Sequence, residues 1–150
     1  MHASINWTQW SVFDELVAYF PGETNPIGGI DSDLVKEENF KDNWRFAIGS
    51  TYQINDDLFY RAGIALDQTA VDNEHRTLSI PESDRLWFSS GLGYQASEDL
   101  TLDFSVTYIK AHGDAEIDES LNLMDIAQVD FSGEASGDVY LVGMQLSYKL

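Results

Sequence analysis

Apolar and polar residues alternate along most of this chain, in long segments separated by polar connections. In the stretch IPESDRLWFSSGLGYQASEDLTLDFSVTYI, apolar side chains fall on nearly every second position, stop at a short polar turn, and then resume. A two-residue period rich in aromatic and β-branched residues is typical of β-strands whose two faces meet different surroundings. The sequence therefore predicts an all-β protein.

Six segments carry this pattern and are predicted as strands. They are residues 3–20, 43–54, 58–71, 84–96, 100–112 and 138–150. No segment keeps a 3.6-residue period for long, and the best helical candidate, 119–129, fits that period poorly. We therefore expect no helical core.

The connections between these segments alternate between two kinds. Residues 55–57 and 97–99 are short polar turns, whereas 21–42, 72–83 and 113–137 are long and polar. Short turns on one side and long loops on the other are typical of outer-membrane barrels, with the long loops outside the cell. The segments are also longer than the roughly five or six residues usual in soluble sheets. We predict one antiparallel up-and-down unit over residues 1–150, with no second domain.

The two faces of each predicted strand differ in chemistry. In the segment 100–112, for example, Leu102 and Phe104 point one way, whereas Asp103 and Ser105 point the other way. A transmembrane barrel wall shows this pattern, with lipid outside and a polar lumen inside. A soluble antiparallel sheet with water on its polar face shows the same alternation, so this alternative stays open at this point.

Composition excludes several functions. The chain has 26 acidic and 8 basic residues, for a formal net charge of −18, which argues against nucleic-acid binding because phosphates need Lys and Arg. It has no cysteine, and its three histidines, His2, His75 and His112, show no metal-ligand spacing. Ser89 and Ser90 have no catalytic partner pattern. We expect no metal, no cofactor and no enzymatic activity.

The N-terminal MHASINW is not a signal peptide, and no run of 18 apolar residues could form a transmembrane helix. Because the strand pattern nevertheless favours an outer-membrane protein, we expect this chain to be a piece of a longer one.

Four stretches resemble the C-terminal third of the FadL-type family, the outer-membrane long-chain fatty-acid transporters. These are WTQWSVFDEL, NFKDNWRFAIGSTYQINDDLFYRAGIALDQT, HRTLSIPESDRLWFSSGLGYQ and GMQLSYKL. The resemblance implies the last six strands of a fourteen-stranded barrel in a Gram-negative outer membrane, without the family's N-terminal plug. It also implies passive diffusion of a long-chain fatty acid or another hydrophobic ligand, held in the lumen and released sideways into the membrane.

The resemblance also implies two ligand-binding residues. Lys36 matches a lysine that lies near the ligand's head group in the family, so we expect Lys36 to bind the carboxylate and Val35 to contact the chain. The alternative is that Lys36 is a solvated loop lysine, and the neighbouring Glu37 and Glu38 would weaken its attraction for an anion.

Five charged residues lie on the predicted polar face: Arg45, Arg61, Arg85, Asp67 and Asp103. They could form a ladder of lumen charges that orients a ligand. They could instead pair with one another and stiffen the wall.

The expected partners follow from the same resemblance. They are outer-membrane lipid, lipopolysaccharide and the barrel-assembly machinery, which reads a C-terminal signal resembled here by Gly143, Leu146, Tyr148 and Leu150, although Leu150 stands where Phe is usual. The alternatives are a soluble antiparallel β-sheet binding module and a general porin or adhesin barrel without fatty-acid specificity.

Overall fold

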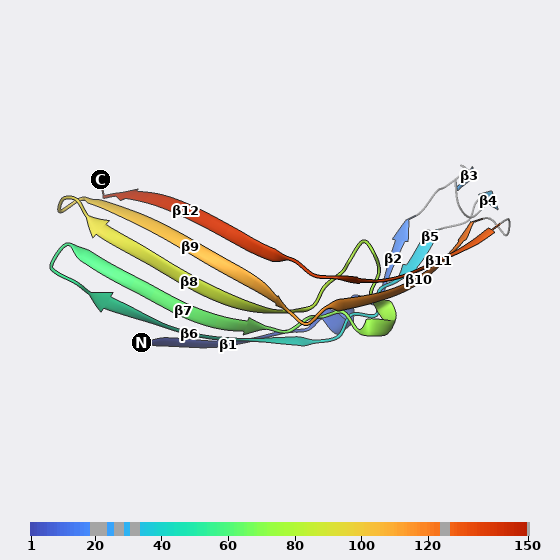
Figure 1. The fold of residues 1–150 in the computed structure, drawn as a ribbon. Helices are drawn as coiled ribbons and strands as arrows, with labels where there is room; N and C mark the ends of the chain where they lie inside the picture. Colours follow the sequence, from blue (N-terminus) through green and yellow to red (C-terminus); the bar gives the residue numbers. More distant parts are fainter. Residues whose placement is uncertain (19–23, 26–28, 31–33, 124–126, 150) are drawn as a thin grey trace.

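The main sheet has six antiparallel strands. The computed structural model describes residues 1–18, 24–25, 29–30, 34–123 and 127–149. Its sheet runs in the order β1 (His2–Thr8), β6 (Asn43–Gln53), β7 (Leu58–Asp67), β8 (Asp84–Gln95), β9 (Leu100–His112) and β12 (Asp138–Tyr148). β1 and β12 are its two outer strands and the sheet is open between them (Figure 1). The predicted all-β, open antiparallel meander is therefore confirmed.

The two ends of the sheet differ as the connection lengths predict. Figure 1 shows the tight turns β6–β7 and β8–β9 at one end and the long connections, with their small extra strands, at the other. In the first turn, Asn55 Oδ1 accepts hydrogen bonds from the backbone N–H groups of Asp57 (3.0 Å) and Leu58 (2.8 Å). An Asn side chain that binds the backbone two or three residues ahead fixes a tight turn.

The first predicted strand, 3–20, is wrong in its length. β1 ends at Thr8, and a 3₁₀ turn, η1 (Trp10–Val12), leads to a separate strand, β2 (Glu15–Ala18). The chain leaves the main sheet because Trp10 and Phe13 both pack on Phe40, with ring centroids 6.2 and 5.4 Å apart. Alternation cannot distinguish one long strand from two short strands in different sheets.

The connection 113–137 is a β-hairpin rather than a loop, and the weak helical candidate 119–129 is wrong. β10 (Ala115–Leu123) pairs with β11 (Ala127–Ala135), with Ala115 opposite Ala135 and Leu123 opposite Ala127. The alternation is present in the sequence, but acidic residues on the polar positions give it the composition of a loop. Other small pairs lie in the first long connection: β2 with β5 (Leu34–Glu37), and β3 (Thr24–Asn25) with β4 (Gly29–Ile30).

The third predicted strand, 58–71, is also too long, because β7 ends at Asp67. Ala70 and Val71 leave the sheet and are buried, as are Ala115 and Ile117 of the hairpin. A short 3₁₀ turn, η2 (Asn73–His75), follows in the same connection. We call this buried cluster the cap, and define it as Ala70, Val71, Arg76, Ala115 and Ile117.

Arg76 joins the two halves of the cap. Its side chain is 6% exposed, its Nε donates to the carbonyl of Glu82 at 2.9 Å, and its Nη1 donates to the carbonyl of Glu116 at 3.3 Å. Glu119 of β10 accepts a further bond from the Leu78 N–H at 3.1 Å. The connection 68–83 and the hairpin therefore fold as one unit. Among the described residues, no helix is long and apolar enough to cross a membrane.

Candidate functional site

One face of the main sheet is apolar from edge to edge. The strand register places Ile48 beside Ile64, Ile64 beside Phe88, Phe88 beside Tyr108, and Tyr108 beside Tyr140. Tyr108 is half-buried, whereas the other four are exposed, and Tyr140 is 75% exposed. Such an extended apolar surface marks an interaction site with protein or membrane.

Aromatic residues mark both ends of this apolar face. The loop end carries contacting rings of Trp7, Trp44, Phe46, Phe88, Tyr108 and Tyr140, and the turn end carries Tyr52, Tyr60, Tyr94 and Tyr148. Eight residues separate the tyrosines on β12, which is about 27 Å along a strand. At a tilt of about 40° the band is roughly 20 Å high, close to the apolar belt of an outer-membrane barrel.

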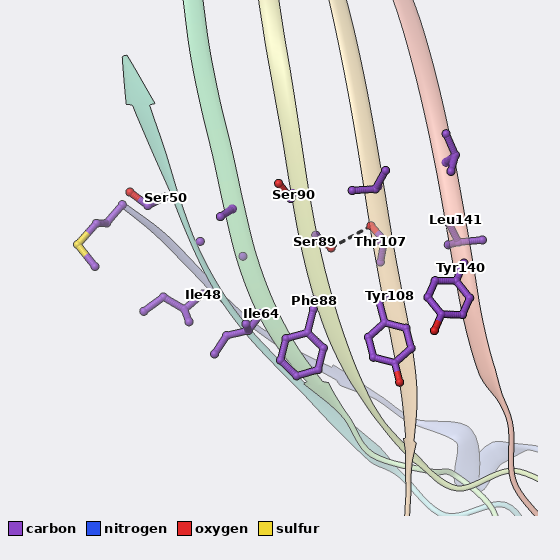
Figure 2. A pocket seen from close by; sticks show the side chains of 16 residues that line it. Ile48, Ser50, Ile64, Phe88, Ser89, Ser90, Thr107, Tyr108, Tyr140 and Leu141 are labelled. Atoms are coloured by element: carbon purple, nitrogen blue, oxygen red, sulfur yellow. Dashed lines mark hydrogen bonds between the residues drawn. The ribbon is translucent and has the colours of Figure 1, made fainter. Parts of the chain in front are cut away.

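A hollow of about 630 Å³ interrupts the apolar face at its centre. Figure 2 shows the rings of Phe88, Tyr108 and Tyr140 side by side along its border, with Ser50 and Ser90 on the row behind them. Small side chains on that row make the hollow. The Ser90 hydroxyl donates to the Tyr60 hydroxyl at 3.0 Å, so it is not left unpaired. The hollow therefore suits hydrocarbon rather than a polar group.

The opposite face is polar and lined by small residues. Gly49 lies opposite Gly63, Gly63 opposite Ser89, and Ser89 opposite Thr107, whose hydroxyl donates to Ser89 Oγ at 3.0 Å. A cleft of about 570 Å³ lies beside this row, with Arg61 among the residues that line it. The predicted division into one apolar and one polar face is confirmed.

Arg61 and Asp103 form the shortest ion pair of the main sheet among the described residues. The atoms Nη1 and Oδ1 are 2.9 Å apart, although the two residues belong to strands that are not neighbours. The pair spans β8 where it carries Gly91 and Gly93, and an added Cβ on Gly93 would lie 1.9 Å from the Phe59 ring and 2.8 Å from Asp103. Missing side chains on β8 therefore make room for the ion pair.

Arg45 and Asp67 lie at the loop end of the same face. Their closest atoms are 3.8 Å apart, and the Arg45 guanidinium lies over the Trp87 ring, 4.5 Å from its centroid. A cation near an aromatic face is attracted by the ring's quadrupole. Sequence reasoning missed Trp87 as a partner, although Arg45 and Trp87 both stand on the polar positions of their strands.

Arg85 completes the set of predicted lumen charges. Its nearest carboxylate is Glu82, with Nη2 and Oε1 3.8 Å apart, and both side chains remain partly exposed. All five predicted charged residues thus have a neighbour of opposite sign, but only Arg61 and Asp103 reach hydrogen-bond distance. Both interpretations of this set remain open on this geometry.

Only the backbone positions of Val35 and Lys36 are described. Both belong to β5, where Val35 lies opposite Val17 and Lys36 opposite Leu16 in the pairing with β2. Their side chains fall outside the described part of the structure. Their role in ligand binding therefore stays a prediction.

Two adjoining cavities lie where the polar face meets the long connections. The apolar chamber, about 400 Å³, is walled chiefly by Trp10, Phe40, Ala70, Ile80 and Pro81. The polar chamber, about 290 Å³, is lined chiefly by Asn6, Arg45, Asp67, Gln68 and Ser83. Trp10, Asn43, Glu82 and Arg85 line both chambers. We call the two together the rim cavity. Sequence reasoning identified only Arg45, Arg85 and Asp67 among its lining residues, because the residues of its apolar wall had been assigned to strands and loops.

In the ranges that the structure describes, no group of three or more His, Asp and Glu side chains could hold a metal ion.

Comparison with known proteins gives these surfaces a context. A family model described as "Outer membrane protein transport protein (OMPP1/FadL/TodX)" matches residues 1–150. The long-chain fatty acid transport protein of Escherichia coli K12 is 34% identical over 148 residues, which cover 99% of this chain and 29% of that protein. The 47 kDa outer membrane protein of Pasteurella multocida is 35% identical over 151 residues, with 99% and 31% covered.

A solved structure agrees with the fold. The crystal structure of a Pseudomonas aeruginosa FadL homologue superposes with a TM-score of 0.81 at 25% identity, over 97% of this chain and 31% of that one. This chain therefore spans about a third of the length of the relatives that it matches. The family is a non-enzymatic transport family of the Gram-negative outer membrane, as the sequence predicted. The chain belongs to the OMPP1/FadL/TodX family of outer membrane transport proteins.

Proposed function

We propose that this chain forms six wall strands of a barrel that carries long-chain fatty acids or similar hydrophobic compounds across the outer membrane by passive diffusion. The observation that carries the proposal is 34% identity, over nearly the whole chain, to a long-chain fatty acid transport protein. The two-faced sheet supports it, because a ligand that crosses a membrane barrel needs a wall that is apolar outside and polar inside.

The two outer strands of the sheet support a longer barrel. Among the described residues, β1 and β12 each have one neighbouring strand, and unpaired backbone edges are not tolerated in the hydrocarbon layer. We propose that further strands close both edges, and that the family resemblance to a fourteen-stranded barrel gives their number. Residues 1–150 would then be its C-terminal part.

The surrounding partners follow from the surface chemistry. The exposed apolar face, with aromatic residues at both ends, suits contact with outer-membrane lipid. Its loop end suits contact with lipopolysaccharide. We also propose that the barrel-assembly machinery recognises the strand β12. Substituting Tyr148 with Ala should lower the yield of inserted barrel in cells, measured by heat-modifiable migration in gels.

The test of the transport function uses the complete barrel encoded by the reading frame that contains this chain. Purified in detergent, it should bind radiolabelled oleate saturably, and it should restore oleate uptake to cells that lack their own transporter. A barrel that inserts and folds but neither binds nor transports oleate would contradict the proposal and leave a general pore.

The same assay tests the two ligand residues. A Lys36→Ala substitution should weaken oleate binding about tenfold, the loss expected for one charge-assisted hydrogen bond. Lys110→Ala is the matched control, because it removes a lysine from the apolar face of the main sheet. Val35→Asn should weaken binding through the chain rather than the head group, and so should affect oleyl alcohol as much as oleate.

A further inference from the structure

The rim cavity combines two kinds of surface, and Arg85 is the cation common to both. Its apolar chamber is lined by aromatic, aliphatic and proline side chains, and its polar chamber contains the Arg45 guanidinium. Arg85 borders both chambers. A cavity with this division matches a molecule that has a hydrocarbon chain and one polar head, and its size falls within the range of small-molecule sites.

The walls of the apolar chamber are held in place by contacts from several segments. Phe40 lies between Trp10 and Phe13, and the Lys41 N–H donates to the carbonyl of Ala70 at 2.8 Å. The Lys41 ammonium also pairs with Asp72 at 2.6 Å. The chamber is therefore formed before a ligand arrives, which lowers the entropic cost of binding.

Arg85 has unused capacity to bind an anion. A strong guanidinium–carboxylate contact has N–O distances of about 2.7–2.9 Å and is often bidentate. Glu82 lies 3.8 Å away, and both side chains are partly exposed. The contact with Glu82 is therefore weak. A carboxylate that enters the cavity can replace it with a shorter, two-point contact.

We propose that the rim cavity is a binding site for a single-chain amphiphile with a carboxylate head. Arg85 contacts the head group, the chain lies against Trp10 and Phe40, and Glu82 competes with the ligand for Arg85. The proposal does not involve Lys36. The inference rests on the proposed transport function, which supplies the class of ligand.

The charges around the proposed head-group position favour reversible binding. The polar chamber holds two arginines, Arg45 and Arg85, but also the carboxylates of Asp67 and Glu82. Arg45 is partly engaged by Asp67 and Trp87, which leaves Arg85 as the cation that faces both chambers. A transporter needs sites that a ligand enters and leaves, and a competing carboxylate weakens the held state without closing the site.

The experiment localises the ligand instead of measuring total binding alone. The complete barrel is incubated with stearate that carries a photoreactive diazirine in its chain, irradiated, and digested for mass spectrometry. We expect labelled peptides that contain Trp10 or Ile80. Arg85→Gln should reduce this labelling about tenfold at subsaturating ligand, because it removes a charge-assisted hydrogen bond.

Glu82→Gln gives the decisive result because it should have the opposite effect. Removing the competing carboxylate should raise rim labelling several-fold, which a purely structural role of the Arg85–Glu82 pair does not predict. Lys110→Gln and Glu98→Gln are the charge-matched controls, since one lies on the apolar face and the other in the far turn. Neither should change the labelling.

The outcomes separate this site from the transport function. Saturable oleate binding with no label near Trp10 or Ile80 overturns the rim site and leaves the proposed function standing. Equal or lower labelling in Glu82→Gln overturns the competition. A diazirine-bearing stearyl alcohol that labels the wild type as strongly as stearate shows that Arg85 does not select the head group. A folded wild-type barrel that does not bind oleate contradicts the proposed function itself.

Discussion

The main sheet and the cap place their apolar side chains in different surroundings. Large apolar side chains of the sheet point outward, and Met144 is 84% exposed, whereas Val71 and Ile117 in the cap are 1% and 2% exposed. The cap buries its apolar groups as a water-soluble domain does, whereas no second layer covers the apolar face of the sheet in the described part of the chain. The sheet therefore requires lipid as its second layer, and the cap does not.

The largest effect is expected from a charge on the outer face of the sheet. Met144 lies midway between Tyr140 and Tyr148, so Met144→Arg places a charge at the centre of the apolar band. The cost should be about 2–4 kcal/mol in a bilayer, measured by urea titration of the folded barrel. Gln145→Arg, on the polar face of the next position, should cost much less. Equal costs at the two positions would refute the assignment of the faces.

Disrupting the cap should affect the loops and spare the sheet. Arg76→Gln removes a buried cation and its two bonds to backbone carbonyls, at an expected cost of about 1–3 kcal/mol to the cap. Limited proteolysis should then cleave within residues 72–83 faster, while the heat-modifiable migration of the barrel stays unchanged. The control is Leu78→Ala, because Leu78 is exposed. A barrel that melts together with the cap would show that the two regions are not separable.

A side chain added at Gly93 on β8 should cause a smaller loss of stability. Gly93→Ala forces the Phe59 ring to move and disturbs the Arg61–Asp103 pair, which should cost about 1–3 kcal/mol, as overpacking usually does. Gly137→Ala is a suitable control because an added Cβ there meets nothing within 4 Å. Urea titration compares the two. If the unfolding midpoint of Gly93→Ala matches that of the wild type, the Phe59 ring does not occupy the space beside Gly93.

The smallest effect concerns acid sensitivity of the hairpin. Hydrogen bonds from Ser120 and Gln128, at 2.8 and 2.9 Å, hold the pKa of Asp130 below its ordinary value of 3.8. This contribution to hairpin stability is present above pH 3.8 and is lost as the pH falls through the lowered pKa of the folded state. Amide hydrogen exchange in β10 and β11, corrected for the intrinsic exchange rates, should therefore accelerate as the pH falls through the lowered pKa of Asp130. Asp130→Asn should remove most of that pH dependence.

Much of the main sheet was predictable from the sequence, because a strand with unlike faces needs strict alternation. The strand 100–112 was predicted to the residue, and 43–54 and 84–96 to within one. Errors arose where alternation continued after the chain had left the sheet, at 9–18 and 68–71; residues 19 and 20 of the first predicted strand lie outside the described part. The hairpin was missed because its polar positions are acidic, and periodicity alone would have revealed it.

The candidate site was only partly predictable. The charged residues of the polar face follow from alternation, and Lys36 follows from family resemblance. The Arg85–Glu82 contact is local, but the apolar chamber brings Trp10 together with Phe40, 30 positions away, and with Arg85, 75 positions away. No local pattern specifies such a meeting, since it depends on how the loops fold over the sheet.

The sequence by itself determined the main strands and their two unlike faces, and the membrane setting followed once the family resemblance was added. These properties depend on side-chain period and chemistry, which are local. Only the tertiary structure decided which groups meet: Arg61 reaches Asp103 across the two glycines of β8, Arg76 joins the 68–83 connection to the hairpin, and Arg85 borders both chambers of the rim cavity. Such meetings depend on strand register and on backbone that lacks side chains, and both become visible only once distant segments are placed in space.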